Sequence, residues 1–413
     1  MKFLLSAVFG ASLVVFAFVS PVRAADTMAC DLAPLMDIPT VWSLTPDKLE
    51  QLFPLPQGAK TNPYYQWMTA DHSRALFMRH RFSNLTVDLT ILDKSVPVEE
   101  CTVDFLGGKV NGITFSIYNR GDSGQADLPE LQRRSAKCNE ALRKSLGVAP
   151  SPRRPDPAQG LLAQGWTWFS PQGMACLEYN PELEHGKAEY MRMRLAPRDA
   201  KGAIAGSMRE HRGGSTLSEL AAAVKHNTQG DVWIEGVPMV DQGAKGYCVV
   251  ASAQRLFEYY GISCDEHQLA QLAGSQAEGG TSSLEMMKAL QTLDQYFHMQ
   301  FRPLALLYTD HKLHEPKSQK PVDEKEYQKL VTEYTSKGIP LLWGLQLGKY
   351  PEEPPLKEQV AGGHMRLIIG CNPRTGQVIF TDSWGLGHEL KRMKLTDAWK
   401  ATDGLFAMQP TTH

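Results

Sequence analysis

The chain has 413 residues, with 43 lysines and arginines against 45 aspartates and glutamates, and 42% of its residues are hydrophobic. This composition is typical of a globular protein and excludes a disordered, collagen-like or coiled-coil chain. At about 150 residues per domain, the length predicts two or three domains. Because the formal net charge is only −2, the chain lacks the basic field that nucleic acid binding requires, and we expect no nucleic acid partner.

Residues 1–24 have the pattern of a secretory signal peptide. Lys2 precedes an apolar run from Phe3 to Val19, and the next residues end at Ala24 on the small side chains that signal peptidase prefers. We therefore expect cleavage after Ala24 and an exported protein, either periplasmic or extracellular. The alternatives are an uncleaved anchor and a lipoprotein that begins at Cys30. No other stretch is long and apolar enough to cross a bilayer, so no stable membrane span is expected after cleavage.

Residues 25–198 are predicted to form one α+β domain built on an antiparallel sheet. Polar and apolar residues alternate from 86 to 91, as on a half-buried antiparallel strand. The runs with strand character are 74–82, 85–92, 101–106, 113–119, 165–169, 174–179 and 188–195. Residues 128–146 have helical spacing and end before Gly147, which predicts a helix, and the proline-rich segment 146–160 predicts an exposed loop. No motif in this domain indicates a function.

The segment 198–215 is rich in glycine and in charges of both signs, which is typical of a linker. We assign residues 199–230 to this linker and a leading helix, and residues 231–413 to a second domain. In that domain, helical spacing follows Cys248 as far as Tyr260, and capping patterns predict two more helices at 266–273 and 284–293. Strand-like runs follow at 339–347, 365–369, 377–381, 389–394 and 405–408.

Cys248 is therefore predicted to lie at the N-terminus of a helix. The orphan N–H groups and the helix dipole at this position favour a thiolate, which is the nucleophilic form of cysteine. The alternative is a buried structural cysteine. Gln242 precedes Cys248 across a glycine-containing loop, so its side-chain amide can donate to the oxygen of a substrate that the sulfur attacks.

His364 and Asp382 are predicted to meet across a β-hairpin. Gly362 and Gly363 precede His364 at the start of one strand, and Asp382 follows the end of the next strand. The residues between the strands, 372–376, have the composition of a turn. Cysteine, histidine and aspartate in this order, with a glutamine before the cysteine, are the set of groups that a thiol hydrolase uses.

The segments 242–248, 362–364 and 382–385 resemble those of papain-superfamily cysteine peptidases, and most closely the branch of bacteriocin-processing, C39-like peptidases. The resemblance covers about residues 233–408. It implies a papain-like domain, in which a helical lobe carries the cysteine and an antiparallel sheet lobe carries the histidine and the acid. The motif of papain itself is absent around Cys248, and Asp382 stands where papain relatives have asparagine.

The resemblance also implies a role for each residue of the set. Cys248 would be the nucleophile, His364 the general base and acid, Asp382 the group that orients the imidazole, and Gln242 an oxyanion donor. We add Gly246, Gly363 and Trp384 as candidates for substrate binding. No cofactor and no metal ion are predicted.

The seven cysteines are an odd number, so at least one thiol is unpaired in an oxidising compartment. We expect this thiol to be Cys248, because the nucleophile must stay reduced. The four cysteines before residue 200 would then be available for two disulfides in any of three connectivities; they are Cys30, Cys101, Cys138 and Cys176. The alternative is that some of them are buried as small apolar side chains. Cys264 and Cys371 either bridge the two lobes or remain reduced and buried.

The sequence thus predicts an exported cysteine peptidase that hydrolyses a peptide or isopeptide amide bond in a protein or peptide substrate. One alternative is a transglutaminase-like acyl transferase, which uses the same order of cysteine, histidine and aspartate. The other is a catalytically silent binding protein with a papain fold.

Overall fold

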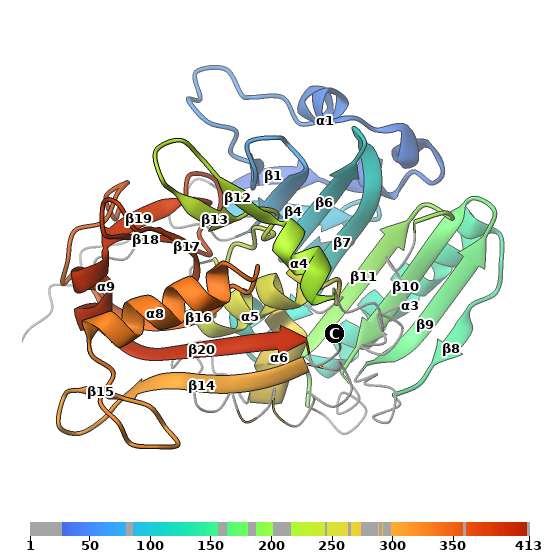
Figure 1. Cartoon of the computed structure of the whole chain (residues 1–413). Helices are drawn as coiled ribbons and strands as arrows, with labels where there is room; N and C mark the ends of the chain where they lie inside the picture. The colour runs from blue at the N-terminus through green and yellow to red at the C-terminus, as the bar shows by residue number, and fades with distance from the viewer. Residues whose placement is uncertain are drawn as a thin grey trace, which may run out of the picture.

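The computed structural model describes residues 27–79, 86–155, 163–180, 187–200, 216–243, 246–262, 266–273, 288, 291, 299–357 and 361–410. The predicted signal peptide, Cys264, the predicted helix at 284–293 and most of the predicted linker lie outside these residues. We call residues 27–200 the N-terminal region and residues 216–410 the C-terminal region. Figure 1 shows the N-terminal region in blue to green and the C-terminal region in yellow-green to red.

Eight of the described strands of the N-terminal region form one antiparallel sheet, in the order β2-β3-β6-β7-β11-β10-β9-β8. Their bounds are β2 Tyr65–Trp67, β3 Arg74–Met78, β6 Glu100–Leu106, β7 Lys109–Asn119, β8 Ser151–Arg153, β9 Gln164–Ser170, β10 Gly173–Tyr179 and β11 Tyr190–Ala196. A smaller sheet consists of β1 (Thr27–Asp31), β4 (Thr86–Ile91) and β5 (Val96–Val98), with β1 and β4 parallel. The helices are α1 (Pro46–Leu52), the short α2 (Arg120–Ser123) and α3 (Leu128–Leu146), with two 3-10 turns, η1 (Ala33–Met36) and η2 (Thr40–Ser43).

The seven predicted strand runs and the predicted helix of this region are present, but β1, β2, β5, β8 and α1 were not predicted. The helix predicted at 128–146 is α3, and it ends on Gly147, which has a left-handed φ of 68°. The predicted loop after α3 differs, because it contains the edge strand β8. Pro152 lies in β8, opposite Trp166, and an edge strand tolerates a residue without an N–H donor.

The C-terminal region is built on a nine-stranded sheet with its main path in the order β12-β13-β17-β16-β20-β14-β15, and β18 connects β17 to β19. The strands are β12 Val224–His226, β13 Val232–Ile234, β14 Met299–Leu307, β15 Leu313–His314, β16 Leu341–Leu347, β17 Gly362–Asn372, β18 Gln377–Thr381, β19 Lys391–Lys394 and β20 Thr402–Pro410. The described helices are α4 Leu217–Ala222, α5 Cys248–Tyr259, α6 Glu266–Ala273, α8 Glu324–Thr335 and α9 Leu395–Ala401.

Helices cover both faces of this sheet. Leu367 and Ile369 of β17 pack with α5 and α6, whereas Ile368, which points the other way, packs with α8 and α9. Because helices cover both faces of the sheet, the strand β17 carries apolar side chains on both of its faces. The position of α5 over one face brings its N-terminus, and therefore Cys248, towards the start of β17.

The N-terminal sheet contacts the segment just before α5. Arg74 of β3 donates to the backbone oxygen of Met239 at 3.0 Å and forms an ion pair with Glu258 of α5 at 3.0 Å. The side chain of Met239 is buried against Met68 and Met78 of the N-terminal region. The two regions are therefore joined at the segment that precedes α5 and at the C-terminal end of that helix.

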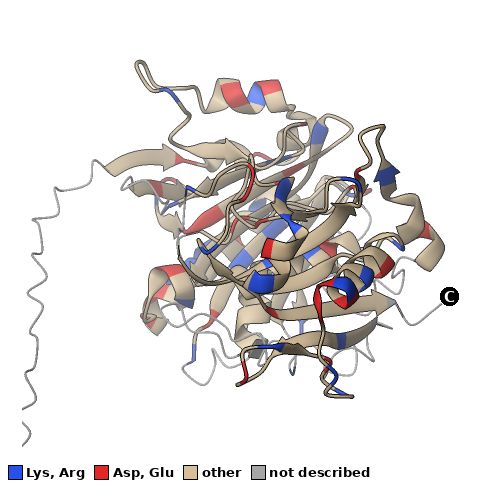
Figure 2. Cartoon of the chain, turned by 60° about the vertical axis from the view of Figure 1, so that its left-hand side comes forward, with Lys and Arg blue, Asp and Glu red and all other residues tan. Residues whose placement is uncertain are grey.

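Charged residues of both signs are interspersed over the helices and strands of both regions, as Figure 2 shows. Within the described part of the chain, no helix is both long enough and apolar enough to cross a bilayer.

The expectation of disulfides in the N-terminal region is wrong for this structure. All six described cysteines are free, and those other than Cys248 are buried; these are Cys30, Cys101, Cys138, Cys176 and Cys371. They fill the core as small apolar side chains, and burial raises the pKa of each of their thiols. Because Cys371 is free, it does not form the bridge considered with Cys264.

Candidate active site

Cys248 is the first residue of α5, and it is partly exposed. The residue before it, Tyr247, does not cap the helix with its side chain. The Ser252 hydroxyl donates to the backbone oxygen of Met365 at 3.2 Å, which ties the first turns of α5 to β17. This bond lies one residue from His364, so Cys248 and His364 are carried by two elements that are fixed to each other.

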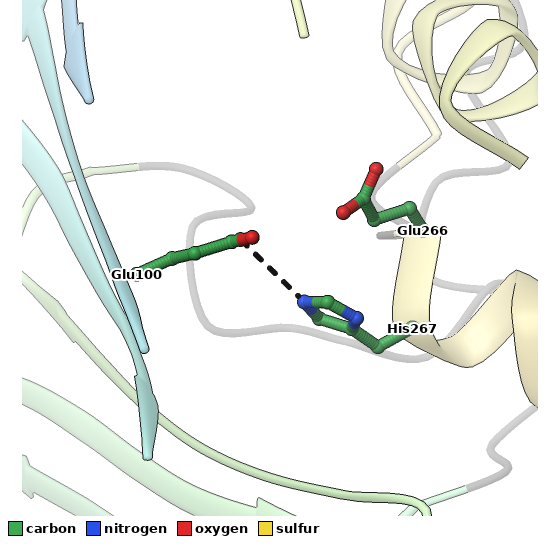
Figure 3. A group of neighbouring side chains, drawn as sticks. All are labelled: Glu100, Glu266 and His267. Carbon is green, nitrogen blue, oxygen red and sulfur yellow. Dashed lines mark ion pairs between the residues drawn. The ribbon is translucent and has the colours of Figure 1, made fainter. Parts of the chain in front are cut away.

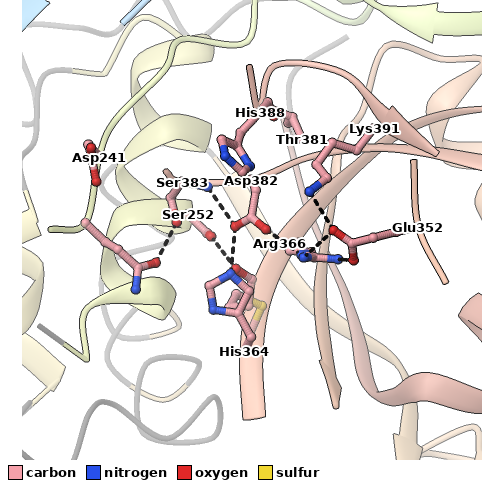
Figure 4. Close-up of polar contacts among 12 residues, drawn as sticks. Asp241, Ser252, Glu352, His364, Arg366, Thr381, Asp382, Ser383, His388 and Lys391 are labelled. Carbon is pink, nitrogen blue, oxygen red and sulfur yellow. Dashed lines mark hydrogen bonds and ion pairs between the residues drawn. The ribbon is translucent and has the colours of Figure 1, made fainter. Parts of the chain in front are cut away.

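The structure places His364 and Asp382 in direct contact, as the β-hairpin of β17 and β18 predicts. His364 Nε2 lies 2.6 Å from Asp382 Oδ1, and both side chains are buried (Figure 4). Among the described residues, the other ring nitrogen, Nδ1, has no well-aligned hydrogen-bond partner. Burial disfavours the imidazolium, but Asp382 outweighs it and, with a further contribution from the Cys248 thiol, raises the pKa of His364 to about 9.

A buried chain of charges stands behind Asp382. Arg366 Nε donates to Asp382 Oδ2 at 2.6 Å, and the Ser383 backbone N–H donates to Oδ1 at 2.9 Å. Glu352 accepts from Arg366 at 2.7 Å and pairs with Lys391 at 2.6 Å (Figure 4). Burial alone would raise the pKa of Asp382, but Arg366 and His364 hold it well below its usual range. Asp382 is therefore an ionised carboxylate at neutral pH.

Trp384 stacks on the imidazole of His364, with ring centroids 4.4 Å apart and an interplanar angle of 14°. The indole is 6% exposed. A flat apolar group on one face of the ring restricts its rotation and excludes water from it. The position of Trp384 directly on His364 is consistent with a role in holding the histidine, in addition to the predicted contact with substrate.

Gln242 is buried in the irregular segment before α5, and two hydrogen bonds hold it. Its backbone N–H donates to the Ser383 backbone oxygen at 3.0 Å, and its side-chain Oε1 accepts from the Ser383 hydroxyl at 2.8 Å. Because the side-chain carbonyl of Gln242 is held in this way, the position of its amide nitrogen is restricted as well. Gln242 is attached in this way to the residue that follows Asp382.

The two glycines predicted to bind substrate lie where the sequence suggested. Gly246 lies two residues before Cys248, and Gly363 is exposed at the start of β17. A Cβ atom at Gly363 would have only Gln346 Nε2 near it, at 3.8 Å, so there is open space beside His364. Their contact with substrate stays a prediction.

The sequence analysis missed the arginines that support the site. Arg366 is two residues after His364 on the same strand, and alternation places both side chains on one face. Arg255 lies two helical turns after Cys248 and donates to the Asp382 backbone oxygen at 2.8 Å and to Thr381 Oγ1 at 2.6 Å. Arg366 lies inside an apolar strand, and Arg255 lies on the apolar face of a helix. A charge in such a position was the signal that could have identified them.

One group of described side chains has donor atoms of the types that bind metal ions, all within 4.8 Å of one another: Glu100, Glu266 and His267. His267 Nε2 lies 3.6 Å from Glu100 Oε2, and Figure 3 shows Glu100 pointing from its strand towards the first residues of α6. This group forms a polar contact between the two regions, and none of its members belongs to the predicted site.

Residues 234–405 match the model of the Peptidase_C39 like family. This match confirms the resemblance found in the sequence over that part of the C-terminal region. No curated protein matches the chain.

Three solved structures are similar to parts of this chain. The peptidase domain of Streptococcus ComA, a bi-functional ABC transporter involved in a quorum sensing pathway, is 14% identical and covers 42% of this chain and 99% of its own, with a TM-score of 0.29. A double glycine motif protease from an AMS/PCAT transporter, in complex with the leader peptide, is 12% identical and covers 45% and 96%, with a TM-score of 0.27. Xylellain, a cysteine protease from Xylella fastidiosa, is 14% identical and covers 46% and 88%, with a TM-score of 0.28.

Proposed function

We propose that this protein is an exported cysteine peptidase that hydrolyses peptide or isopeptide amide bonds through Cys248, His364 and Asp382. The observation that carries this proposal is the buried contact of His364 Nε2 with Asp382 at 2.6 Å, which leaves Nδ1 as the ring nitrogen available to Cys248. A carboxylate on one ring nitrogen stabilises the imidazolium and orients the other nitrogen towards the nucleophile. The match to the C39-like family supports the same class of reaction.

The reaction begins with an ion pair between the Cys248 thiolate and the His364 imidazolium. The sulfur attacks the amide carbon, and the carbonyl oxygen becomes an oxyanion that accepts from the Gln242 amide and from the Cys248 backbone N–H. His364 then donates its proton to the amide nitrogen, the carbon–nitrogen bond breaks, and a thioester to Cys248 remains. Water, deprotonated by the now neutral His364, attacks the thioester and releases the carboxylic acid and the thiol.

The buried charges suit His364 for this double role. The pKa of about 9 keeps the imidazolium charged at neutral pH until the leaving amine takes its proton. The ionised Asp382, fixed by Arg366, stays in place while His364 loses and regains the proton. Ser383 forms hydrogen bonds with both Asp382 and Gln242, so one residue positions the carboxylate that orients His364 and the oxyanion donor.

The test uses the full chain and a proteome-derived peptide library, with cleavage sites mapped by mass spectrometry. We expect the wild type to cut peptides and Cys248→Ala to abolish cleavage, since no thioester can form. His364→Ala should slow both cleavage and alkylation of Cys248. Cys138→Ala, a buried thiol of α3, is the matched control and should cleave normally.

Three outcomes would contradict the proposal. Full turnover by Cys248→Ala would exclude this nucleophile. Incorporation of an added amine in place of hydrolysis would indicate an acyl transferase. Absence of cleavage together with slow alkylation of Cys248 would indicate a silent binding protein.

We also propose that residues 1–24 direct export and are removed. The pattern of Lys2, the apolar run and Ala24 supports this part of the proposal. Expression of the full chain in a bacterial host, followed by fractionation and N-terminal sequencing, should find the protein outside the cytoplasm with Ala25 as its first residue. A cytoplasmic chain that retains Met1 would contradict it.

A further inference from the structure

A groove with a volume of about 1030 Å³ runs between the two regions, beside the candidate active site. Leu55 and Trp67 line it from the N-terminal region, and Trp384 and Leu386 line it from the C-terminal region. Its volume is at the upper limit of the range of about 300–1000 Å³ that is usual for ligand sites in proteins.

The groove is connected to His364 through one residue of its wall. Trp384, which forms part of its wall, is the residue stacked on His364. Gln66 also lines the groove and donates to Asp241 Oδ2 at 2.6 Å, next to Gln242. A Cβ atom on Gly385 would lie 3.2 Å from Gln66 Nε2, so the loop after Trp384 passes close to the same side chain. Gln66, in the wall of the groove, therefore contacts both the segment that carries Gln242 and the loop that follows Trp384.

The groove presents apolar side chains to solvent. Leu55 is 52% exposed and Leu386 is 53% exposed, on opposite regions of the chain. Between them, Trp67 is held in one orientation, because its Nε1 donates to Glu50 at 3.0 Å and its ring stacks on His72 at 4.3 Å. Exposed apolar side chains with a polar rim mark binding sites, and a rigid aromatic wall reduces the entropy that binding costs.

We propose that this groove binds the segment of the substrate that follows the scissile bond, and that it selects large apolar side chains there. The inference rests on the proposed peptidase function. Because His364 must protonate the leaving amine, the chain that departs with this amine lies on the side of His364. Trp384 covers that histidine and opens into the groove, so the departing chain enters between Leu386 and Leu55. The N-terminal region thereby acts as a specificity element.

Cleavage of a peptide library by the wild type, Leu386→Asp and Leu55→Asp tests the proposal. We expect the wild type to favour leucine, phenylalanine and methionine in the positions after the cut. Each variant should reduce kcat/KM for such peptides by about tenfold or more, the range expected when apolar contacts in a pocket are lost. Preferences before the cut should not change. Leu307→Asp is the control, since Leu307 is 41% exposed but does not line the groove.

A binding measurement separates failure of this inference from failure of the peptidase function. Dye-labelled decapeptides, one with leucine and phenylalanine side chains and one with serine in their place, are titrated into Cys248→Ala and followed by fluorescence anisotropy. The apolar peptide should bind, and adding Leu386→Asp or Leu55→Asp should weaken it about tenfold. If the wild type cleaves with an unchanged profile in both variants, or if the apolar and serine peptides bind equally, the groove does not select apolar segments. If binding persists as expected without any cleavage, only the peptidase function fails.

Discussion

Replacing Asp382 by asparagine should lower the pKa of His364 from about 9 towards its ordinary value of 6.5. Asp382 contributes most of the attraction that raises this pKa, and burial opposes it. Without the carboxylate, burial is opposed only by the contribution of Cys248, so most of the preference for the imidazolium is lost. The change from 6.5 to about 9 corresponds to about 3 kcal/mol of preference for the imidazolium, since one pKa unit is about 1.4 kcal/mol.

The sign of this effect fixes its dependence on pH. Because the pKa of His364 is raised in the folded protein, its contribution to stability is complete below pH 6.5 and is lost as the pH rises to about 9. Asp382→Asn also leaves Arg366 with a poorer partner, because an amide nitrogen can face its Nε. That loss is the same at pH 6 and at pH 10, since neither Asp382 nor Arg366 titrates between them. The difference between the two pH values therefore reports on His364 and its interaction with Cys248 rather than on Arg366.

Two measurements test this prediction. NMR titration of labelled histidine rings gives the pKa of His364 directly, with His364→Gln used for assignment. Urea denaturation at pH 6 and at pH 10 gives the free energy of unfolding, and Asp382→Asn should cost about 3 kcal/mol more at pH 6 than at pH 10. A variant in which His364 still titrates near pH 9, or in which the loss is equal at both pH values, would refute this account of the site.

Three further predictions concern buried groups. Alkylation of the native protein should label Cys248 first, because the other described thiols are buried and their pKa values are raised; dominant labelling of Cys371 in mass mapping would contradict this. Arg366→Met should lower the free energy of unfolding by about 3–5 kcal/mol in urea denaturation, because it leaves Asp382 and Glu352 buried without their shared cation; a loss below about 1 kcal/mol would contradict it. Glu178→Gln should destabilise the N-terminal region by a similar amount, since buried arginines surround this carboxylate, and unchanged thermal unfolding would disprove this.

The sequence predicted the elements whose signals are local. The helix after Cys248 and the hairpin that joins His364 to Asp382 each depend on residues within one short segment, so spacing and turn composition were sufficient. The helices α8 and α9 were not predicted. Helix α8 follows a charged segment, which concealed the apolar stripe of Tyr327 and Val331 that packs on the sheet.

The support of the site was not predictable, because its contacts join distant segments. Gln66 and Asp241 are separated by 175 positions, and Gln242 and Ser383 by 141. Without the fold, nothing in the sequence relates one member of such a pair to the other. Arg366 is the exception, since strand alternation alone puts it on the face of His364.

The segment 238–243 explains why the two regions belong to one functional unit. It carries Gln242, yet it has no regular secondary structure, so other parts of the chain determine its conformation. Ser383 holds it from the C-terminal region, whereas Arg74, through Met239, and Gln66, through Asp241, hold it from the N-terminal region. An oxyanion donor acts only if it is already in place when charge develops on the substrate. In the proposed mechanism, contacts from the N-terminal sheet therefore contribute to the geometry of the reaction as well as to the groove, although no residue of that sheet belongs to the proposed catalytic set.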